Sequence, residues 1–561
     1  MSWRLLLASV FVLAVGFESQ SWAQSAIRIT ADTPQRIDAL FAAWDNTRSP
    51  GCALGVSLNG SLVYSRAYGM SNLEDDVPIT PDSIFSIGSI SKQFTAFSIA
   101  LLASDGKLSL DDDVRRYLPQ VPDLGPTITI RHLLTHTSGL RDAWDLVFLG
   151  GVRPGDRITQ GDVLTMVARQ EASDFVPGTE YFYNNAGYIL LAEIVEAVSG
   201  QSQREFAETR IFGPLGMRHT SIEDDRTMIV RSRAAGYRPR VGGGWTKWFP
   251  VSEVLGADGV LTTVGDLLKW EENFDDARLG GRALLDEMQT SGRWNDGTST
   301  GYGFGLEVGT YQGIRAVGHG GTAGGYVSNV VRFPDQHLAI AAVCNLRSIN
   351  PRALTRAVAD ILLGSGLLVP PVPLSPAVSV REDELAALAG TYWNPIAGVR
   401  RFVMQDERLT MDGVGPLTPI GGGRFRGAPN ELLFPPLRGG APQGLQILMP
   451  AQTIVFSRVT EPSYSASELS AYAGEYRSDE LDATFSVRVQ SDGHLAVSRH
   501  RSDPIQLSAL KLDTFFANFS DGAGTVTFAR AASGVTGFVI TGRTPRRMAF
   551  TRLDSKPSAG K

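Results

Sequence analysis

Cysteine and histidine are scarce in this chain. Its 561 residues include only 2 cysteines and 7 histidines, and these do not fall into the spacing of a zinc site. We therefore expect no bound metal and no cofactor. Basic residues form no run and do not alternate with aromatic side chains, and the net charge at pH 7 is −6. These features indicate no nucleic-acid partner.

The two cysteines lie in apolar segments that have the composition of strands. Cys52 lies within residues 51–56, and Cys344 lies within residues 339–344. A single disulfide is permitted if the protein is exported. We favour two free thiols buried in a core, with a Cys52–Cys344 disulfide as the alternative.

Long hydrophobic runs are also rare, and the one of note is at the N-terminus. Residues 5–17 are mainly apolar, Arg4 precedes them, and Ser21-Trp22-Ala23 places small residues at both recognition positions for cleavage. The run is too short to span a membrane well. The sequence therefore predicts a signal peptide over residues 1–23, an exported protein that is periplasmic or secreted, and no stable membrane span.

The chain is long enough for about three or four domains at roughly 150 residues each. Prolines are concentrated in residues 368–380, which predicts a stiff linker there. Beyond it, residues 384–392 resemble residues 468–476, and strand-like segments with Asp-Gly or Gly-rich turns follow each copy. We expect two small antiparallel β-barrels from an internal duplication, over residues 381–461 and 462–561. One larger β domain is the alternative.

The first domain, expected over residues 24–367, contains a Ser-x-x-Lys pattern at Ser89 and Lys92. A buried helix is predicted to follow, because apolar side chains recur at spacings of three, four and seven: Ile90, Phe94, Phe97, Leu101 and Leu102. Residues three apart share a helix face, so the Ser89 hydroxyl and the Lys92 amine can meet at its N-terminal end. Burial and the positive end of the helix dipole both lower the pKa of a lysine, and a neutral lysine can accept a proton from serine.

Ser-x-x-Lys alone is typical of exposed helix surfaces, so its meaning depends on the other motifs of the domain. Tyr183-x-Asn185 lies in an Asn- and Gly-rich loop, where both side chains could face one cleft, although a loop tyrosine is usually a packing residue. His319 is followed by Gly320 and Gly321, and these glycines let the backbone approach a ligand closely.

Strand patterns near the start and near the end of this domain predict an antiparallel sheet. Residues 53–58 and 61–69 are joined by Asn59-Gly60, a strong hairpin signal. Residues 327–333 alternate, turn at Pro334-Asp335 and return over residues 338–343. The glycine-rich strand that contains His319 is expected at an edge of this sheet, beside a pocket.

Four elements stand in a fixed order: Ser89-x-x-Lys92, His136-x-Ser138-Gly139-Leu140, Tyr183-x-Asn185 and His319-Gly320-Gly321. This ordered set resembles the serine hydrolases related to class C β-lactamases and penicillin-binding proteins, over roughly residues 30–365. The resemblance implies an α/β (α+β) catalytic domain with an antiparallel sheet and helices.

Within that family the sequence is most similar to the D-aminopeptidases. Residues 89–95 resemble their nucleophile segment, and residues 138–144 are similar to the loop downstream of it. The motif at residues 319–321 is His-Gly-Gly, as in D-aminopeptidases, whereas β-lactamases typically have Lys-Thr-Gly at the corresponding place. Residues 476–483 also resemble a D-aminopeptidase segment. The resemblance implies that the two C-terminal barrels are lipocalin-like.

The resemblance assigns a role to each motif residue. Ser89 attacks a carbonyl and forms an acyl-enzyme, and neutral Lys92 takes its proton. Tyr183 relays a proton to the leaving group, helped by positive charge on Lys92 and His319. The backbone N–H groups of Ser89 and Thr322 form an oxyanion hole. Other motif residues contact the substrate or line the cleft: Asn185, which holds a substrate amide, His319, Gly320 and Gly321. His132 and His136 are expected to be structural.

Specificity is expected to depend on the second barrel. In D-aminopeptidases a loop of the last barrel presents an acidic residue to the free ammonium of the substrate. The matching segment here is residues 516–524, where Asp521 is the counterpart, or else the first residue of an Asp-Gly turn. The segment is short, so the cleft could instead admit esters or longer peptides.

Three functions remain open at this point. The first is a D-amino-acid-directed amidase or aminopeptidase, and the second is an esterase or β-lactamase-like hydrolase with the same residues. The third is a non-catalytic ligand-binding relative. In the first two cases the partner is a small peptide, amide or ester, and a homo-oligomer is compatible with the sequence.

Overall fold

The structure is a computed structural model. It describes residues 27, 29–153, 155–250, 252–364, 375–427, 431–435, 442–448, 453–499, 502–519, 522–542 and 545–553. The predicted signal peptide, Asp521 and residues 368–374 of the predicted linker lie outside the described residues. The domain limits expected from the sequence remain predictions.

A six-stranded antiparallel sheet forms the centre of the first domain, in the order β12-β13-β14-β15-β1-β2. The hairpin predicted at Asn59-Gly60 is present, and both residues have positive φ, as a tight hairpin turn requires. The strands of this sheet are β1 Cys52–Leu58, β2 Ser61–Tyr68, β12 Glu307–Tyr311, β13 Ile314–Ala323, β14 Tyr326–Phe333 and β15 Leu338–Cys344.

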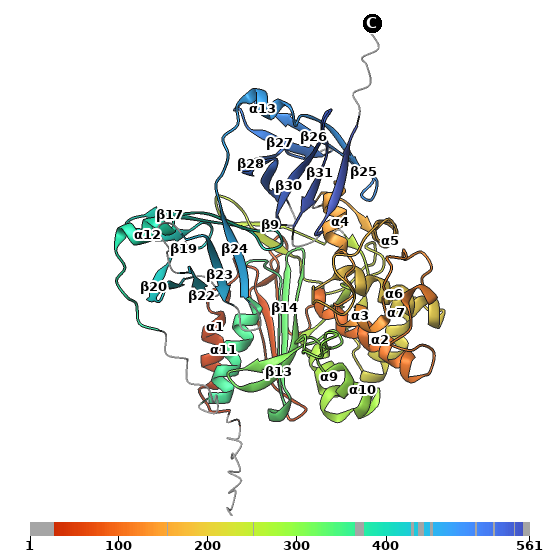
Figure 1. Cartoon of the computed structure of the whole chain (residues 1–561). Helices are drawn as coiled ribbons and strands as arrows, with labels where there is room; N and C mark the ends of the chain where they lie inside the picture. Colours follow the sequence, from red (N-terminus) through yellow and green to blue (C-terminus); the bar gives the residue numbers. More distant parts are fainter. Residues whose placement is uncertain are drawn as a thin grey trace, which may run out of the picture.

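Helices cover both faces of this sheet (Figure 1). One face packs against α1, Thr33–Phe41, and α11, Pro351–Leu363, whose buried side chains Ile37, Phe41 and Val358 share a core with the strands. The other face packs against α9, Val264–Asp276, and beyond it lies α2, Lys92–Ser104, the buried helix predicted after Ser89. The predicted end of α2 at Asp105 is confirmed.

The remaining elements of the first domain are gathered mainly on the α2 side, and α6 is the longest of them. Its other helices are α3 Ile130–Leu134, α4 Ala143–Leu149, α5 Gln160–Ala168, α6 Asn185–Ser199, α7 Gln203–Ala207, α8 Gly213–Leu215 and α10 Gly281–Met288, with short turns η1 Gly88–Ser91, η2 Val114–Arg116, η3 Glu208–Phe212 and η4 Pro334–Gln336. Its short strands are β3 Met70–Asn72, β4 Val77–Pro78, β5 Phe85–Ser86, β6 Ile158–Thr159, β7 Ser221–Ile222, β8 Tyr237–Pro239, β9 Trp245–Lys247, β10 Ser252–Glu253 and β11 Val260–Thr262.

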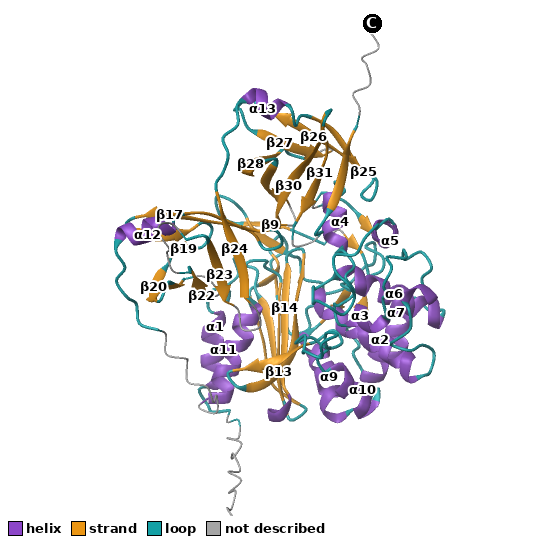
Figure 2. Ribbon diagram, in the orientation of Figure 1, coloured by secondary structure: helices purple, strands orange, loops and turns teal. Residues whose placement is uncertain are grey.

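Two antiparallel barrels follow, as predicted (Figure 2). The first is a nearly closed sheet of nine strands, and the second is a closed barrel of eight. The first contains β16 Gly390–Asn394, β17 Gly398–Gln405, β18 Arg408–Met411, β19 Gly415–Pro416, β20 Thr418–Gly421, β21 Arg424–Arg426, β22 Glu431–Leu433, β23 Gly444–Leu448 and β24 Thr453–Val459. The second contains β25 Gly474–Ser478, β26 Ala483–Val489, β27 Leu495–Arg499, β28 Ile505–Lys511, β29 Thr514–Phe519, β30 Gly522–Ala531, β31 Gly534–Thr541 and β32 Met548–Arg552.

Both barrels begin in the same way, which supports the internal duplication. A short helix, α12 Glu382–Leu388 or α13 Ala466–Ser470, leads into the first strand. In each first strand a buried tyrosine hydroxyl donates to the carbonyl four residues earlier, at 2.8 Å for Tyr392 and 2.7 Å for Tyr476. An arginine of the last strand, Arg458 or Arg552, donates to carbonyls at the end of that helix. One larger β domain is therefore excluded.

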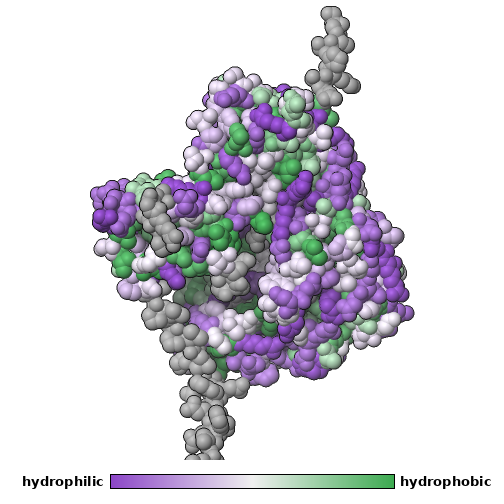
Figure 3. All heavy atoms as spheres, in the orientation of Figure 1, coloured by the Kyte–Doolittle hydropathy of each residue, from purple (hydrophilic) through white to green (hydrophobic). Residues whose placement is uncertain are grey.

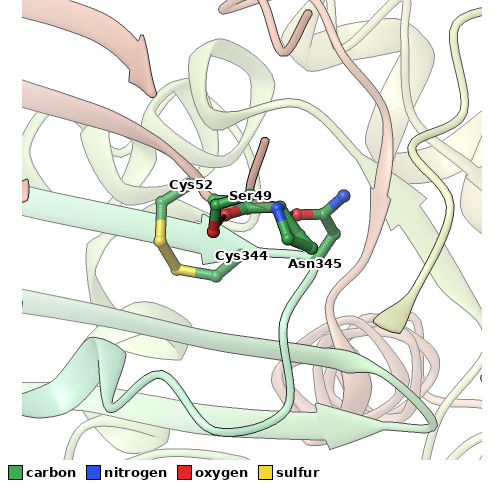
Figure 4. Close-up of a disulfide and its surroundings, with 6 residues drawn as sticks. Ser49, Cys52, Cys344 and Asn345 are labelled. Carbon is green, nitrogen blue, oxygen red and sulfur yellow. Dashed lines mark hydrogen bonds between the residues drawn. A yellow bond between two sulfur atoms is a disulfide. The ribbon is translucent and has the colours of Figure 1, made fainter. Parts of the chain in front are cut away.

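The expectation of two free thiols is wrong, because Cys52 and Cys344 form a disulfide (Figure 4). The two cysteines are directly opposite each other on neighbouring antiparallel strands, β1 and β15, with their Cα atoms 4.0 Å apart. The next residue, Asn345, accepts a hydrogen bond from Gly51 N at 2.8 Å, so the same strand end is held on both sides. The bridge therefore links the ends of two neighbouring strands, β1 and β15, in the interior of the sheet.

Within the part of the chain that the structure describes, no helix is long and apolar enough to cross a membrane.

Candidate active site

Ser89 and Lys92 meet at the start of α2, as the sequence predicts. Ser89 lies in the short turn η1, and the Lys92 Nζ atom is 3.2 Å from the Ser89 Oγ atom. The turn is pressed against strand β13: a Cβ atom on Gly88 would lie 2.3 Å from Thr322 N, and one on Gly321 would lie 1.8 Å from Ile87 O. Glycine at both positions therefore brings the serine turn and the strand into backbone contact.

The amine of Lys92 is fully buried and has three polar neighbours. Besides the Ser89 hydroxyl, it lies 2.9 Å from Asn185 Oδ1 and 2.9 Å from Ala257 O. The amide oxygen and the carbonyl can only accept hydrogen bonds. A neutral amine would donate its two protons to these oxygens, which directs its lone pair to the Ser89 hydroxyl. The geometry thus fits proton transfer from Ser89 to Lys92.

Burial lowers the pKa of Lys92 to about 7, and the carboxylates of Asp258 and Asp142 act in the opposite direction. A substantial fraction of the amine is therefore neutral at neutral pH. Burial also raises the pKa of Asp258 to about 6. The Asp258 carboxylate favours the Lys92 ammonium, and the ammonium in turn lowers the pKa of Asp258.

Tyr183 stands beside the amine of Lys92, whose Nζ atom is 4.8 Å from the centre of the ring. Burial raises the pKa of Tyr183 well above its usual value, and the nearby Ser89 hydroxyl offsets only part of this effect. The two hydroxyl groups do not meet hydrogen-bond geometry, and the Tyr183 oxygen has no hydrogen-bond partner among the described residues. A phenol that stays protonated in this position suits donation of a proton to a leaving group.

Asn185 is held by an aspartate that the sequence analysis did not identify as a site residue. Asp142 Oδ2 accepts hydrogen bonds from Asn185 N at 2.5 Å and from Asn185 Nδ2 at 3.0 Å. The other amide atom of Asn185 accepts from Lys92. In the structure Asn185 therefore links Asp142 to Lys92, and its expected contact with a substrate amide remains a prediction.

His319 is neutral at neutral pH, contrary to the expectation that it adds positive charge. Burial lowers the pKa of His319 to about 4, against the opposing effect of Glu307. Its ring nitrogens lie 2.5 Å from Gly320 O and 2.9 Å from the hydroxyl of Tyr302. Since a carbonyl only accepts, Nδ1 carries the proton and Nε2 accepts from Tyr302. His319 therefore fixes the shape of the cleft wall.

The expected structural role of His136 agrees with its position behind Tyr183. The rings of His136 and Tyr183 are 4.4 Å apart, and His136 bonds to the backbone on both sides of Tyr183. Phe182 N donates to His136 O at 2.9 Å, and Asn184 N donates to His136 Nδ1 at 3.1 Å. His132 instead accepts from Thr129 N at the start of α3, away from these contacts.

A cleft of about 560 Å³ opens beside these residues. Its lining includes Ser89, Tyr183, His319, Gly320, Gly321 and Thr322. Asn185, which was also predicted to contact the substrate, is not among the described residues that line it. The pairing of β12 with β13 ends at Gly318, which leaves residues 319–323 as the sheet edge there. The glycine-rich edge beside a pocket is therefore confirmed. Gly321, however, mainly accommodates protein backbone, whereas it was predicted to admit a ligand.

Charged side chains are part of the cleft lining. Glu307 and Arg352 form an ion pair at 2.6 Å. Arg347 also lines the cleft and lies over the ring of Trp248, 5.9 Å from its centre. Among the described carboxylates none forms an ion pair with Arg347. Arg347 therefore brings a positive charge to the cleft without a described carboxylate as its partner.

Two further predictions concern Asp521 and a bound metal. Asp521 lies outside the described residues, while β29 and β30 on either side of it pair directly with each other. In the described ranges no group of three His, Cys, Asp or Glu side chains could hold a metal ion.

The residues that the sequence analysis missed carry weak local signals. Asp142 precedes a short apolar helix and caps it through Trp144 N, at 3.0 Å, which is the ordinary role of such an aspartate. Asp258 lies in an Asp-Gly turn, and Arg347 follows a core strand without any motif. Only the folded chain shows that all three face one site.

Comparison with known proteins gives consistent matches. A family model described as Beta-lactamase matches residues 37–365. The D-aminopeptidase of Cereibacter sphaeroides is 28% identical over 479 residues, covering 82% of this chain and 86% of the relative. That of Brucella canis is 27% identical over 462 residues, covering 81% and 84%.

Two solved structures share the fold. The octameric penicillin-binding protein homologue from Pyrococcus abyssi aligns with a TM-score of 0.54 at 23% identity, covering 84% of this chain and 98% of that chain. The D-amino acid amidase from Ochrobactrum anthropi SV3 aligns with a TM-score of 0.51 at 25% identity, covering 60% of this chain and 100% of that chain.

Proposed function

Because the chain belongs to the beta-lactamase family and is a serine hydrolase, we propose that it hydrolyses the amide bond of D-amino-acid amides or short D-aminoacyl peptides. The observation that carries the reaction type is the Lys92 amine, which two acceptors orient toward Ser89. The substrate class rests on the D-aminopeptidase and D-amino acid amidase relatives.

In the acylation step the Ser89 oxygen attacks the substrate carbonyl while its proton passes to the neutral Lys92 amine. The carbonyl oxygen becomes an oxyanion, and the N–H groups of Ser89 and Thr322 would stabilise it. Tyr183 donates its proton to the departing amine and recovers one from the Lys92 ammonium. The C–N bond breaks, and an ester on Ser89 remains.

Deacylation reverses these proton transfers with water as the nucleophile. Lys92 is neutral again once it has returned its proton through Tyr183. It can therefore take a proton from a water that attacks the ester, and the same N–H groups hold the second oxyanion. The C–O bond to Ser89 breaks, the serine oxygen regains the proton from Lys92, and the free acid leaves.

The first test is a substrate panel with a nucleophile variant. We expect D-alanine p-nitroanilide to be hydrolysed and L-alanine p-nitroanilide to be hydrolysed much more slowly. Ser89→Ala should lower turnover by at least about 10³-fold. Hydrolysis of p-nitrophenyl acetate alone would retire the D-amino-acid specificity but keep the acyl-enzyme. No turnover by a folded wild-type protein, and no loss in the variant, would contradict the proposal.

One observation favours a second substrate class, esters or β-lactams that carry a carboxylate. Arg347 offers a positive charge in the cleft, whereas the acidic residue of the described lining, Glu307, is already paired with Arg352. Nitrocefin tests this class. Arg347→Gln should raise KM for nitrocefin, whereas Arg238→Gln, the other arginine over Trp248, at 5.0 Å, should not. Equal effects of the two substitutions would remove the argument for this class.

Export, assembly and the role of Asp521 are proposed on sequence grounds. Residues 1–23 should be removed on export, which mass spectrometry of the N-terminus after cell fractionation would show. A homo-oligomer should appear as a mass above one chain in light scattering.

If Asp521 binds the substrate ammonium, Asp521→Asn should raise KM for D-alanine p-nitroanilide and leave KM for p-nitrophenyl acetate unaffected.

A further inference from the structure

The second barrel rests on the part of the first domain that leads to the active site. In the space-filling view it is continuous with the helical side of the first domain, while the first barrel projects as a separate lobe (Figure 3). Leu146 and Leu149 of α4 belong to the hydrophobic core of the second barrel. The contact is therefore built into both cores.

A buried ion pair lies in this interface. Arg141 Nη1 contacts Glu480 Oε1, and the two side chains are only 3% and 8% exposed. Glu480 Oε1 also accepts from Glu171 N at 3.1 Å, and Arg141 Nη2 donates to Arg547 O at 2.8 Å. Arg141 Nε also lies 3.6 Å from Asp174 Oδ1 of the first domain, so Glu480 is one of two buried carboxylates at this guanidinium. Removal of one charge from such a buried group destabilises the charges that remain.

A second contact holds the segment that leads to Tyr183. The guanidinium of Arg546 donates to both oxygens of Glu180, at 2.8 and 2.6 Å. The backbone N of Arg546 donates to Asp174 Oδ1 at 2.8 Å, and Asp174 N in turn donates to Gly139 O at 2.7 Å. The β31–β32 loop thus contacts the 174–180 segment and, through it, residue 139.

Arg141 of the ion pair directly precedes an active-site residue in the sequence. Arg141 is followed by Asp142, whose carboxylate holds Asn185 through two hydrogen bonds. Asn185 accepts from the Lys92 amine at 2.9 Å. Arg141 and Glu480 also lie in residues 138–144 and 476–483, the two segments that resemble D-aminopeptidases.

We propose that the Arg141–Glu480 ion pair lets the second barrel hold Asp142 in place beneath the catalytic residues. Arg141 and Glu480 are then positioning residues, and the second barrel is part of the catalytic apparatus. The inference rests on the proposed function of Ser89 and Lys92. It does not depend on the identity of the natural substrate.

The pH dependence of Ser89 reactivity is the suitable readout. The charged and titratable groups that act on Lys92 or face it are Asp142, Asp258, Tyr183, Tyr188, His136 and His319. Burial keeps both tyrosines and both histidines neutral near pH 7. If Asp142 withdraws, the carboxylate support of the Lys92 ammonium weakens, so the acid limb of reactivity moves to lower pH.

The experiment uses intact-protein mass spectrometry to measure the rate at which a fluorophosphonate labels Ser89. The pH is varied from about 5 to about 9, a range that brackets the pKa of Lys92. Glu480→Gln should slow labelling about 10- to 100-fold at the plateau and move the acid limb to lower pH. Arg141→Lys, which keeps the charge but loses the fork, should give a smaller change in the same direction. Folding of each variant is checked by thermal unfolding.

Asp482→Asn is the matched control. Asp482 lies in the same β25–β26 hairpin and crosses the same interface to Arg169 at 3.2 Å, but both side chains are about half exposed, at 48% and 40%. It should label like the wild type. Equal behaviour of Glu480→Gln and Asp482→Asn, or slower labelling with an unmoved or raised acid limb, would overturn the inference. Failure of the folded wild type to label at Ser89 would instead overturn the proposed function.

Discussion

At the scale of single residues, the most informative one is Lys92, whose buried amine lies between two acceptors and the Ser89 hydroxyl. It can accept a proton only when neutral, so activity should fall as the pH drops below its pKa of about 7. Asp258→Asn removes a carboxylate that raises the pKa of Lys92, so the acid limb of kcat/KM should move to lower pH.

The expected size follows from the meaning of a pKa: a decrease of one would raise the rate at pH 6, relative to that at pH 8, by about tenfold at most. Asp266→Asn is the control, because this buried carboxylate accepts hydrogen bonds from His219 N and Lys269 and not from Lys92. An acid limb that moves to higher pH in Asp258→Asn would show that Lys92 is not the titrating base.

His136 gives a second prediction at this scale, because its acceptor and its ring can be removed separately. His136→Asn keeps an acceptor for Asn184 N and loses the ring, whereas His136→Phe keeps the ring and loses the acceptor. We expect the phenylalanine variant to lose about 10-fold or more in amide hydrolysis, since an unpaired buried N–H displaces Tyr183.

Hydrolysis of p-nitrophenyl acetate separates positioning from general damage, because its leaving group needs no proton. It should be affected less than hydrolysis of the anilide. His132→Phe, which removes the acceptor for Thr129 N in the capping box of α3, should reduce both activities equally or leave both unchanged. Equal losses on both substrates in His136→Phe would contradict a role in the placement of Tyr183.

At the scale of elements, local patterns in the sequence predicted what local forces determine. The Asn59-Gly60 hairpin and the apolar face of α2 follow from positive φ and from helical spacing, and both are present. The meeting of Ser89 with Lys92 also spans only one helical turn. The contact of Asp142 with Asn185 joins residues 43 positions apart, and no periodicity reports it.

The disulfide shows the same limit. Cys52 and Cys344 each lie in an apolar strand, and composition alone cannot distinguish a buried thiol from half of a bridge. What decides the question is that β1 pairs with β15 in a register that sets the two residues opposite each other. That pairing joins positions 292 residues apart. The neutral state of His319 was missed for a similar reason, since its burial depends on Tyr302 and on neighbouring strands.

The bridge allows a prediction about stability. Replacing Cys52 and Cys344 together by alanine should lower the free energy of unfolding of the first domain by about 2–4 kcal/mol, because the unfolded chain is no longer cross-linked. Urea unfolding followed at the sheet, with and without reductant, measures this loss. Reductant should destabilise the wild type and have no effect on the double variant; an equal response of both proteins would show that the bridge is not formed.

At the scale of the whole molecule, the two barrels repeat one design but are attached differently. Arg458 and Arg552 close their barrels by equivalent contacts with the preceding helix. The second barrel shares its core with α4, whereas the first barrel meets the second through cation–π contacts, such as Lys511 over Trp393 at 3.9 Å. The duplication therefore produced one barrel that is bound to the catalytic domain through buried side chains.

This difference predicts how the molecule unfolds. Leu149, which is 1% exposed and packs in the core of the second barrel, should tolerate no charge, because an unpaired buried carboxylate costs several kcal/mol. Leu149→Asp should split thermal unfolding into separate transitions, expose the linkage between the domains to proteases and reduce labelling of Ser89. Val403→Asp, an equivalent change on the first barrel at a side chain that is 51% exposed, should do none of these. A single transition in Leu149→Asp, together with wild-type labelling, would show that the second barrel is not integrated with the active site, because the reaction at Ser89 would then survive the loss of an apolar contact between α4 and that barrel.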